Sequence, residues 1–436
     1  MRNNDVTVHP TRGDQGRQRP TRLAREHIGV LDIGTSKIVC MIANTRPAIA
    51  GAAPITEFAG IGHQQSAGIK AGVIIDLDAA EHAVRAAVAQ AERMAGVTLD
   101  EVQIGVACGR LKSNHFTAEA KIERGVVQAS DLARLSDGAR SYTEKDGRVL
   151  VHLNRLVYAL DGAVGIRDPL GMAGRLLSAN LHAVTADDAP LRNLLLLAER
   201  CYLTPSGLVP TSLASALAAT TEDERRLGVT VVDIGAGVTT IAVFADGQYL
   251  FTDTLAQGGG HMTYEIAKFL AAPLAESERI KAVYGTMVVA ASDERDVFSY
   301  SLAGEPDGVR QTSNKARLRS VLRPRVQSLL IHVRDRLDAA GMAAYGGGRM
   351  VLTGGGAQVI GLANFAAEVL ARPVRIGRPS LLAGSPSSLN GPAFATAFGL
   401  LAAANDPGAA VLAGSRRPDL ASGYLGRMGQ WLRESF

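Results

Sequence analysis

Cysteine is scarce in this sequence, and the few that occur exclude several kinds of site. Cys40, Cys108 and Cys201 lie far apart in the chain, and their spacing matches no metal-binding motif. They also do not form the dense cysteine framework of a small secreted domain. We therefore expect all three to be small, buried apolar side chains.

Long apolar runs are also absent, and the net charge is low. No stretch approaches the roughly 20 uninterrupted apolar residues that span a bilayer. The N-terminal residues lack the apolar core of a signal peptide, so we expect a cytoplasmic chain. A formal net charge of +4 over 436 residues gives little support for nucleic-acid binding, which needs a clustered basic face. We expect no nucleic-acid partner.

Two segments differ in composition from the rest of the chain. Residues 1–26 are rich in Arg, Gln, Asn, Pro and Gly without apolar periodicity, which predicts a disordered basic arm. Residues 405–422 are rich in Asp, Pro, Gly, Ala, Ser and Arg, which predicts a flexible linker. The 47 % hydrophobic and 20 % charged residues overall are typical of a folded protein, and the length suggests more than one domain.

A strand–turn–strand unit occurs twice. The first copy reads HIGVLDIGTSKIVCMIA and the second, some two hundred residues later, reads GVTVVDIGAGVTTIAVFADGQ. In each, an apolar run meets Asp-Ile-Gly, turns on small residues and continues as a second apolar run. The repeat predicts two related halves.

The spacing of apolar residues between the two copies suggests an insertion. A helix with apolar residues at helical spacing is predicted to end at Gly96, and a strand-rich segment follows it. We therefore predict a first half beginning with 27–100, an inserted domain over 101–186, and the rest of the first half with the second half over 187–404. The segment EVQIGVA, at the start of the insertion, is predicted to be an exposed edge strand suited to strand addition.

Three glycine-rich turns each follow an apolar strand. They are Gly34-Thr35-Ser36, Gly235-Ala236-Gly237 and Gly354-Gly355-Gly356. Small residues let backbone N–H groups approach a polyphosphate. Asp32 and Asp233, one in each Asp-Ile-Gly, can hold the waters of a nucleotide-bound Mg²⁺ across a cleft. One such turn alone is most often just a tight turn, but three together favour a nucleotide site between two halves.

The Asp-Ile-Gly repeats and VLTGGGAQVIGL resemble the phosphate and adenosine motifs of the actin/Hsp70/sugar-kinase superfamily. Within it, GGGHMTYEIAKFLAAPLAESERIKAVYG and RVQSLLIHVRDRL are similar to FtsA, the bacterial actin-like cell-division family, over about residues 27–405 and the C-terminal tip. The resemblance implies an α/β, actin-like, two-lobed fold with an inserted α+β domain. It also implies ATP and Mg²⁺ as ligands, with at most slow hydrolysis.

The resemblance carries site roles over residue by residue. It implies a first phosphate loop formed by Asp32, Gly34, Thr35, Ser36 and Lys37, and a second formed by Asp233, Gly235, Ala236, Gly237 and Thr239. It implies a close backbone passage at Gly258, Gly259 and Gly260, and an adenosine turn at Gly354, Gly355 and Gly356. On the ribose or adenine side it places, with a less certain role, Glu278 and Lys281.

Two positions predicted near this site differ from the family pattern. The family usually has acidic residues where this chain has Arg323 and Gln327, and we expect these two to form a solvated face. No catalytic residue is assigned. His261 is the candidate for positioning an attacking water, and a helix cap or a core histidine is the alternative.

The only tryptophan, Trp431, lies in the last six residues. On a helix over 423–436, the apolar side chains gather over an arc of roughly 140° with arginines opposite. A helix this short needs a surface on which to fold, which is its own domain, a partner groove or a membrane. Aromatic and basic residues favour an anionic membrane, as does the family resemblance. The predicted membrane residues are Leu425, Met428, Trp431, Leu432, Phe436, Arg427 and Arg433.

These features lead to one functional prediction. We expect an ATP-binding scaffold that polymerises on the cytoplasmic face of the inner membrane as a peripheral protein. The resemblance implies that it tethers FtsZ through the FtsZ C-terminal peptide and recruits later division proteins through the inserted domain. The alternatives are a phosphoryl-transfer enzyme of the same superfamily, either a sugar kinase or a polyphosphate hydrolase, and a pilus-assembly actin homologue.

Overall fold

The computed structural model describes residues 27–46, 55–143, 145–305 and 310–405, which are called the described residues below. The predicted arm over 1–26, the predicted linker after residue 405 and the predicted terminal helix over 423–436 lie outside them. Within the described residues, no helix has both the length and the apolar character required to cross a membrane.

The first half is built on a five-stranded sheet. Its strands, in spatial order, are β11 (Thr204–Pro210), β6 (Glu101–Val106), β1 (His27–Ile33), β2 (Lys37–Arg46) and β3 (Ile55–Gln65). The first three run parallel to one another, and β2 and β3 then alternate in direction. The strand β1 is therefore central, and it ends at the first Asp-Ile-Gly.

The second half repeats this sheet. Its strands, in the same spatial order, are β18 (Val374–Ile376), β17 (Met350–Thr353), β12 (Val229–Ile234), β13 (Thr239–Ala245) and β14 (Gln248–Leu255). The pattern of parallel and antiparallel pairs is also the same. Even the register agrees, because Asp32 pairs with Val39 and Asp233 pairs with Thr240. The predicted two-lobed α/β fold with related halves is confirmed.

The strand β6 corrects one expectation. The sequence predicted an exposed edge strand that opens the inserted domain, but residues 101–106 pair with β1 on one side and β11 on the other. Five of the six residues are buried, as is typical of a central strand covered on both faces. This strand therefore belongs to the sheet of the first half, and the start predicted for the insertion, residue 101, is too early.

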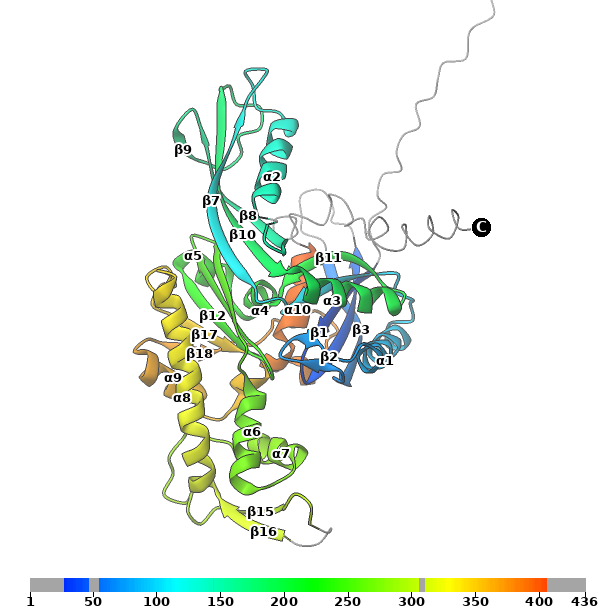
Figure 1. Cartoon of the computed structure of the whole chain (residues 1–436), viewed down its shortest axis with the longest axis vertical. Coiled ribbons are helices and arrows are strands. Elements are labelled where there is room, and N and C mark those ends of the chain that lie inside the picture. The colour runs from blue at the N-terminus through cyan, green and yellow to red at the C-terminus, as the bar shows by residue number, and fades with distance from the viewer. Residues whose placement is uncertain (1–26, 47–54, 144, 306–309, 406–436) are drawn as a thin grey trace, which may run out of the picture.

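The inserted unit stands at one end of the molecule (Figure 1). It contains β7 (Lys112–Lys121), β10 (Leu176–Asp187), β8 (Arg148–Leu160), β9 (Ala163–Ile166) and the helix α2 (Ala129–Thr143). It has an apolar core of its own, which includes Leu135, Leu153 and Leu177. Its sheet joins that of the second half at a single pair, Lys112 of β7 with Asp253 of β14.

Other elements cover the two sheets. In the first half, α1 (Leu77–Ala95) packs on β2 and β3, and α3 (Asp188–Arg200) packs beside it. The α1 helix ends at Gly96, where φ is 71° and glycine is favoured. The remaining elements are β4 (Ile69–Lys70), β5 (Val73–Ile74), α5 (Glu222–Leu227), α6 (Gly259–Leu270), α7 (Leu274–Tyr284), β15 (Val297–Ser301), β16 (Arg310–Asn314), α8 (Lys315–Ala339), η1 (Gly355–Gln358), α9 (Leu362–Leu370), η2 (Ser387–Leu389) and η3 (Pro392–Phe394).

Two helices connect the halves. The helix α4 (Thr211–Ala219) packs on β12 and β13, α10 (Ala395–Asn405) packs on β1 and β6, and the two helices pack on each other. Figure 1 shows them side by side in the middle of the molecule. Their backbones touch, because a Cβ on Gly399 would lie 1.7 Å from the carbonyl oxygen of Ala214. This contact sets the separation of the two sheets.

The α4–α10 contact yields the first prediction. We expect Gly399→Ala to lower the free energy of unfolding by at least about 1–3 kcal/mol, since the added methyl group forces the helices apart. Gly138→Ala, on α2, is the matched control because a Cβ there has no neighbour within 4 Å. This control should gain about 0.5–1 kcal/mol from helix propensity. Urea unfolding measures both, and equal stability of the two variants would contradict the prediction.

Candidate functional site

The two Asp-Ile-Gly turns have the same backbone geometry. The N–H of Gly34 donates to the carbonyl oxygen of Lys37 at 2.9 Å, and that of Gly235 donates to Val238 at 2.9 Å. A Cβ on either glycine would lie 2.8 Å from the same carbonyl oxygen. Each turn is therefore as tight as the backbone allows, and a larger residue would open it.

The two turns also meet each other. A Cβ on Gly237, in the second turn, would lie 2.6 Å from the Thr35 hydroxyl oxygen in the first. That hydroxyl accepts a hydrogen bond from the N–H of Gly72 at 3.1 Å. Ser36, next to it, is exposed. The structure thus brings the two predicted phosphate loops into direct contact.

The third glycine turn packs against Asp233, the carboxylate of the second half. A Cβ on Gly354, where φ is 84°, would lie 2.2 Å from an Asp233 carboxylate oxygen, and one on Gly356 would lie 2.4 Å from Ile234. Gly355 differs, because the nearest atom to its Cβ position, in Ala393, is 4.0 Å away. Two glycines of this turn are required by packing, and the third borders open space.

The start of α6 lies against the second turn. The N–H groups of Gly259 and Gly260 donate to the carbonyl oxygens of Gly235 at 2.8 Å and Ala236 at 2.7 Å. A Cβ on Gly258 would lie 2.3 Å from the Gly235 oxygen. The backbone of these three glycines therefore passes close to the second turn, and all three of their N–H groups are used by the protein, since that of Gly258 donates to His261.

Lys281 and Glu278, both on α7, reach the same place. The Lys281 ammonium donates to the Glu278 carboxylate at 2.7 Å, to the Thr263 hydroxyl at 2.7 Å and to the Gly259 carbonyl oxygen at 3.0 Å. The ammonium is also 3.5 Å from the Cβ position of Gly259. The structure brings this pair to the start of α6, beside the glycine turns.

The electrostatics of the site centre on three charged groups. Burial raises the pKa of Asp32 to about 6, against the opposing effect of Lys37 and with a further increase from Asp233. Burial also raises the pKa of Asp233 and lowers the pKa of Lys37, although both carboxylates favour the ammonium. Lys37 therefore acts electrostatically on both predicted Mg²⁺-binding carboxylates.

The residues that support these charges carry no signal in the sequence. Lys37 donates to the Ala393 carbonyl oxygen, and its ammonium lies 4.1 Å from the centre of the Phe394 ring. The Thr396 hydroxyl donates to Asp233 at 3.1 Å, and Ser215 lowers the pKa of Asp233 against the larger effect of burial. Ser215 comes from α4, and the segment around the start of α10 supplies Ala393, Phe394 and Thr396. The sequence of that segment, GPAFAT, carries only the turn signal Gly-Pro.

Several expected hydroxyl and ring groups have structural partners. Thr239 donates to the Gln257 carbonyl oxygen at 2.7 Å. His261 accepts the Gly258 N–H on Nδ1 at 3.2 Å, which is a helix-capping contact, and burial lowers its pKa. Gln327 is exposed, as expected. Arg323 is not merely solvated, because its guanidinium lies 4.4 Å from the centre of the Phe365 ring.

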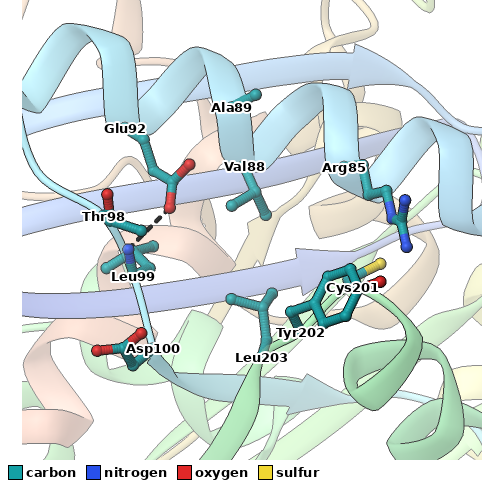
Figure 2. Close-up of a pocket in the computed structure, with 10 residues that line it drawn as sticks. All are labelled: Arg85, Val88, Ala89, Glu92, Thr98, Leu99, Asp100, Cys201, Tyr202 and Leu203. Carbon is teal, nitrogen blue, oxygen red and sulfur yellow. Dashed lines mark hydrogen bonds between the residues drawn. The ribbon is translucent and has the colours of Figure 1, made fainter.

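Among the described residues, one pocket lies next to these turns and another lies away from them. One of about 330 Å³ is lined by η1, the start of α9, Arg378 and Pro392, so it adjoins the third glycine turn. Another of about 300 Å³ lies between α1 and the segments that precede β6 and β11 (Figure 2). The lining of the second contains no predicted site residue.

The related sheets, the paired carboxylate turns and the insertion after β6 define an actin-like protein with an inserted unit. Among solved structures, the chain resembles the PilM-PilN type IV pilus biogenesis complex, with a TM-score of 0.63 at 17 % identity over 87 % of this chain and 99 % of that one. It also resembles MreB 5 of Spiroplasma citri bound to AMPPNP, with a TM-score of 0.50 at 13 % identity over 87 % and 96 %. These likenesses show the fold.

Sequence comparison then gives the family. The model of the family Cell division protein FtsA matches residues 230–399, and the SHS2 domain inserted in FtsA matches residues 108–185. The chain is 41 % identical to cell division protein FtsA of Agrobacterium fabrum over 431 residues, which cover 96 % of this chain and 97 % of that protein. It is 29 % identical to the Escherichia coli protein over 93 % and 97 %. The chain belongs to the FtsA family of cell division proteins.

The raised pKa of Asp32 yields the second prediction. Because the folded-state pKa of about 6 exceeds the usual 3.8, ionisation of Asp32 above that pH costs stability in the ligand-free protein. We expect Asp32→Asn to raise the free energy of unfolding by about 1–3 kcal/mol at pH 7.5. The gain should shrink as the pH falls through 6 and vanish below 4.

Urea unfolding between pH 4 and 8 measures this dependence. Asp335→Asn serves as the control, since its side chain is 56 % exposed and pairs only with the adjacent Arg334; it should change stability little at any pH. A loss of stability in Asp32→Asn at pH 7.5 would show that the carboxylate is stabilising, contrary to the prediction.

Proposed function

We propose that this FtsA-family chain is an ATP-binding scaffold of bacterial cell division. In this proposal it polymerises on the cytoplasmic face of the inner membrane, tethers FtsZ filaments through the FtsZ C-terminal peptide and recruits later division proteins through the inserted unit. ATP and Mg²⁺ between the halves would favour the closed arrangement that permits contacts between subunits. Hydrolysis is at most slow in this proposal.

The single observation that carries the nucleotide part is the pair of partly buried carboxylates at the meeting of two glycine turns. Asp32 and Asp233 are held where burial disfavours their ionised forms, and Lys37 is the cation that acts on both. A hydrated divalent cation would offset this cost, because Mg²⁺ retains waters that donate to carboxylates. The residues present therefore fit a Mg²⁺–polyphosphate.

Each part of the chain would then have a separate role. The bound Mg²⁺ would neutralise phosphate charge. Thr35, Ser36 and Ala236 would offer backbone or hydroxyl groups to the phosphates, and Lys37 would supply positive charge. The open space beside Gly355, next to the pocket lined by η1, would hold the adenosine.

The family assignment and the terminal sequence support scaffolding over the alternatives. A sugar kinase or polyphosphate hydrolase has little use for an amphipathic tip, and a pilus-assembly homologue should lack it. The contact between His261 and the start of α6 is explained by capping alone. A short helix over 423–436 would bind lipid weakly, so polymers that present many tips would provide avidity.

The space at Gly355 yields the third prediction. We expect Gly355→Leu to weaken Mg²⁺–ATP binding at least tenfold, since the side chain would fill the adenosine space. Stability should change little, because the nearest atom to the Cβ position is 4.0 Å away. Equilibrium dialysis with labelled ATP measures the affinity, and urea unfolding measures the stability.

Gly138→Leu is the matched control for this substitution. It adds the same side chain at an exposed helical glycine of α2, where no atom lies within 4 Å of the Cβ position, and it should bind ATP like the parent. Unchanged affinity in Gly355→Leu would show that the adenosine does not occupy this space. A parent chain that binds no nucleotide would overturn the nucleotide part of the proposal.

The terminal helix yields the fourth prediction, which concerns residues outside the described ranges. We expect the full chain with Mg²⁺–ATP to sediment with anionic liposomes and to carry FtsZ with it. A chain that ends at Ser422, and a Trp431→Glu/Leu432→Glu variant, should leave both proteins in the supernatant because the apolar face of the helix is lost.

FtsZ that lacks its C-terminal peptide separates the two activities. In that control, the full chain should still sediment while FtsZ remains soluble. Liposome binding by the chain that ends at Ser422, equal to that of the full chain, would place the membrane contact elsewhere. Co-sedimentation of the shortened FtsZ would assign its binding to another surface.

A further inference from the structure

A buried cluster of polar side chains lies where the inserted unit meets the second half. His182 on β10 is fully buried, and Ser113 on β7 is its neighbour at 2.8 Å. The side of the second half is formed by Tyr249 and Thr252 on β14. Polar groups are kept at such depth only where they are hydrogen-bonded to one another, so each contact here has a defined partner.

The hydrogen bonds of His182 fix its tautomer. Its Nδ1 lies 2.8 Å from the Tyr249 carbonyl oxygen, which only accepts, so Nδ1 carries the proton. Burial and the neighbouring His115 and His152 lower the pKa of His182 to about 3, so the ring is neutral and Nε2 accepts from the Ser113 hydroxyl. The neutral His182 ring thus joins the inserted unit to β14.

Ser113 extends the cluster to a second residue of β14. Its hydroxyl oxygen accepts the N–H of Thr252 at 2.7 Å. The Thr252 hydroxyl lies 2.7 Å from the Ser212 hydroxyl, and the Tyr249 hydroxyl lies 2.9 Å from the same atom. Ser212 is on α4 and only 1 % exposed. A single hydroxyl group of α4 therefore joins both β14 residues that bind the inserted unit.

The same helix is connected to the candidate nucleotide site through the elements it packs on. These are β12, which carries Asp233 near its end, and α10, whose Thr396 hydroxyl donates to the Asp233 carboxylate at 3.1 Å. Ser215, one turn after Ser212, is fully buried, and its hydroxyl donates to the Ser212 carbonyl oxygen at 3.3 Å. A short helix thus contacts the elements that hold Asp233 and, through the Ser212 hydroxyl, the junction of the inserted unit.

From this continuous set of contacts we infer that Ser212 is a positioning residue that couples the occupancy of the Asp233 site to the orientation of the inserted unit. The inference rests on the proposed function, because it takes Mg²⁺–ATP as the occupant. A bound cation changes what Asp233 requires of Thr396 on α10, and α4 moves with α10 because the two helices touch at Gly399. Ser212 then carries the shift to Tyr249 and Thr252.

The test measures the orientation of the inserted unit directly. Spin labels are placed through Val164→Cys on β9 and Val289→Cys beyond α7, which are 78 % and 69 % exposed, while the native cysteines are buried. Electron–electron double resonance gives the distance between the labels with and without Mg²⁺–ATP. We expect a nucleotide-dependent change in the parent and a change at most half as large in Ser212→Ala.

Two further variants make the result specific. Tyr249→Phe removes a different hydroxyl from the same cluster and should reduce the change in the same direction. Ser313→Ala, at a buried serine of β16, should behave like the parent. Affinity for ATP, measured by dialysis, should stay within twofold in all three, because none of them contacts the glycine turns.

Each outcome separates this inference from the proposed function. A full-sized change in both Ser212→Ala and Tyr249→Phe overturns the coupling, and so does a parent that binds ATP without any change in label distance. In both cases the nucleotide part of the proposed function stands. A parent that binds no ATP overturns the proposed function, and the inference with it.

Discussion

Two partly buried carboxylates that act on one ammonium are the interaction on which the rest of this structure depends. Asp32 and Asp233 come from equivalent strands of the two halves, and burial raises the pKa of each. Lys37 offsets part of this cost, and burial lowers its own pKa in return. Such an arrangement is poor for stability alone. In the proposed function, a bound Mg²⁺ would offset this cost.

Glycine makes this arrangement sterically feasible. The contact of Gly237 with Thr35 brings the two turns together, and the contact of Gly354 with Asp233 brings the third turn onto the carboxylate. Gly399 performs the same role at a distance, because it lets α10 touch α4. Thr396 on α10 then donates to Asp233, and Ser215 on α4 lowers the pKa of that carboxyl. The site is therefore built from the close approach of backbones that any Cβ would separate.

The sequence predicted the parts of the structure that local pattern determines. The repeated Asp-Ile-Gly units gave the related halves, and Gly96 gave the end of α1, because both signals lie within a few residues. The place of β6 was missed, since the apolar run over 102–106 fits a buried central strand as well as the start of a new domain. Ser215 and Thr396 were missed because a hydroxyl in an alanine-rich helix carries no sign of a partner far away in sequence.

The two halves are related, but the site is not symmetric, and the difference has a physical cause. Counting from each aspartate, Lys37 corresponds to Val238, and Ser36 corresponds to Gly237. Val238 is buried and its side chain would lie 3.2 Å from a Cβ on Gly72 of the first half. An ammonium there would face apolar packing without a partner, at a large desolvation cost. The duplicated fold thus supplies two carboxylates but one lysine at these equivalent positions, and the proposed Mg²⁺ would balance the excess negative charge.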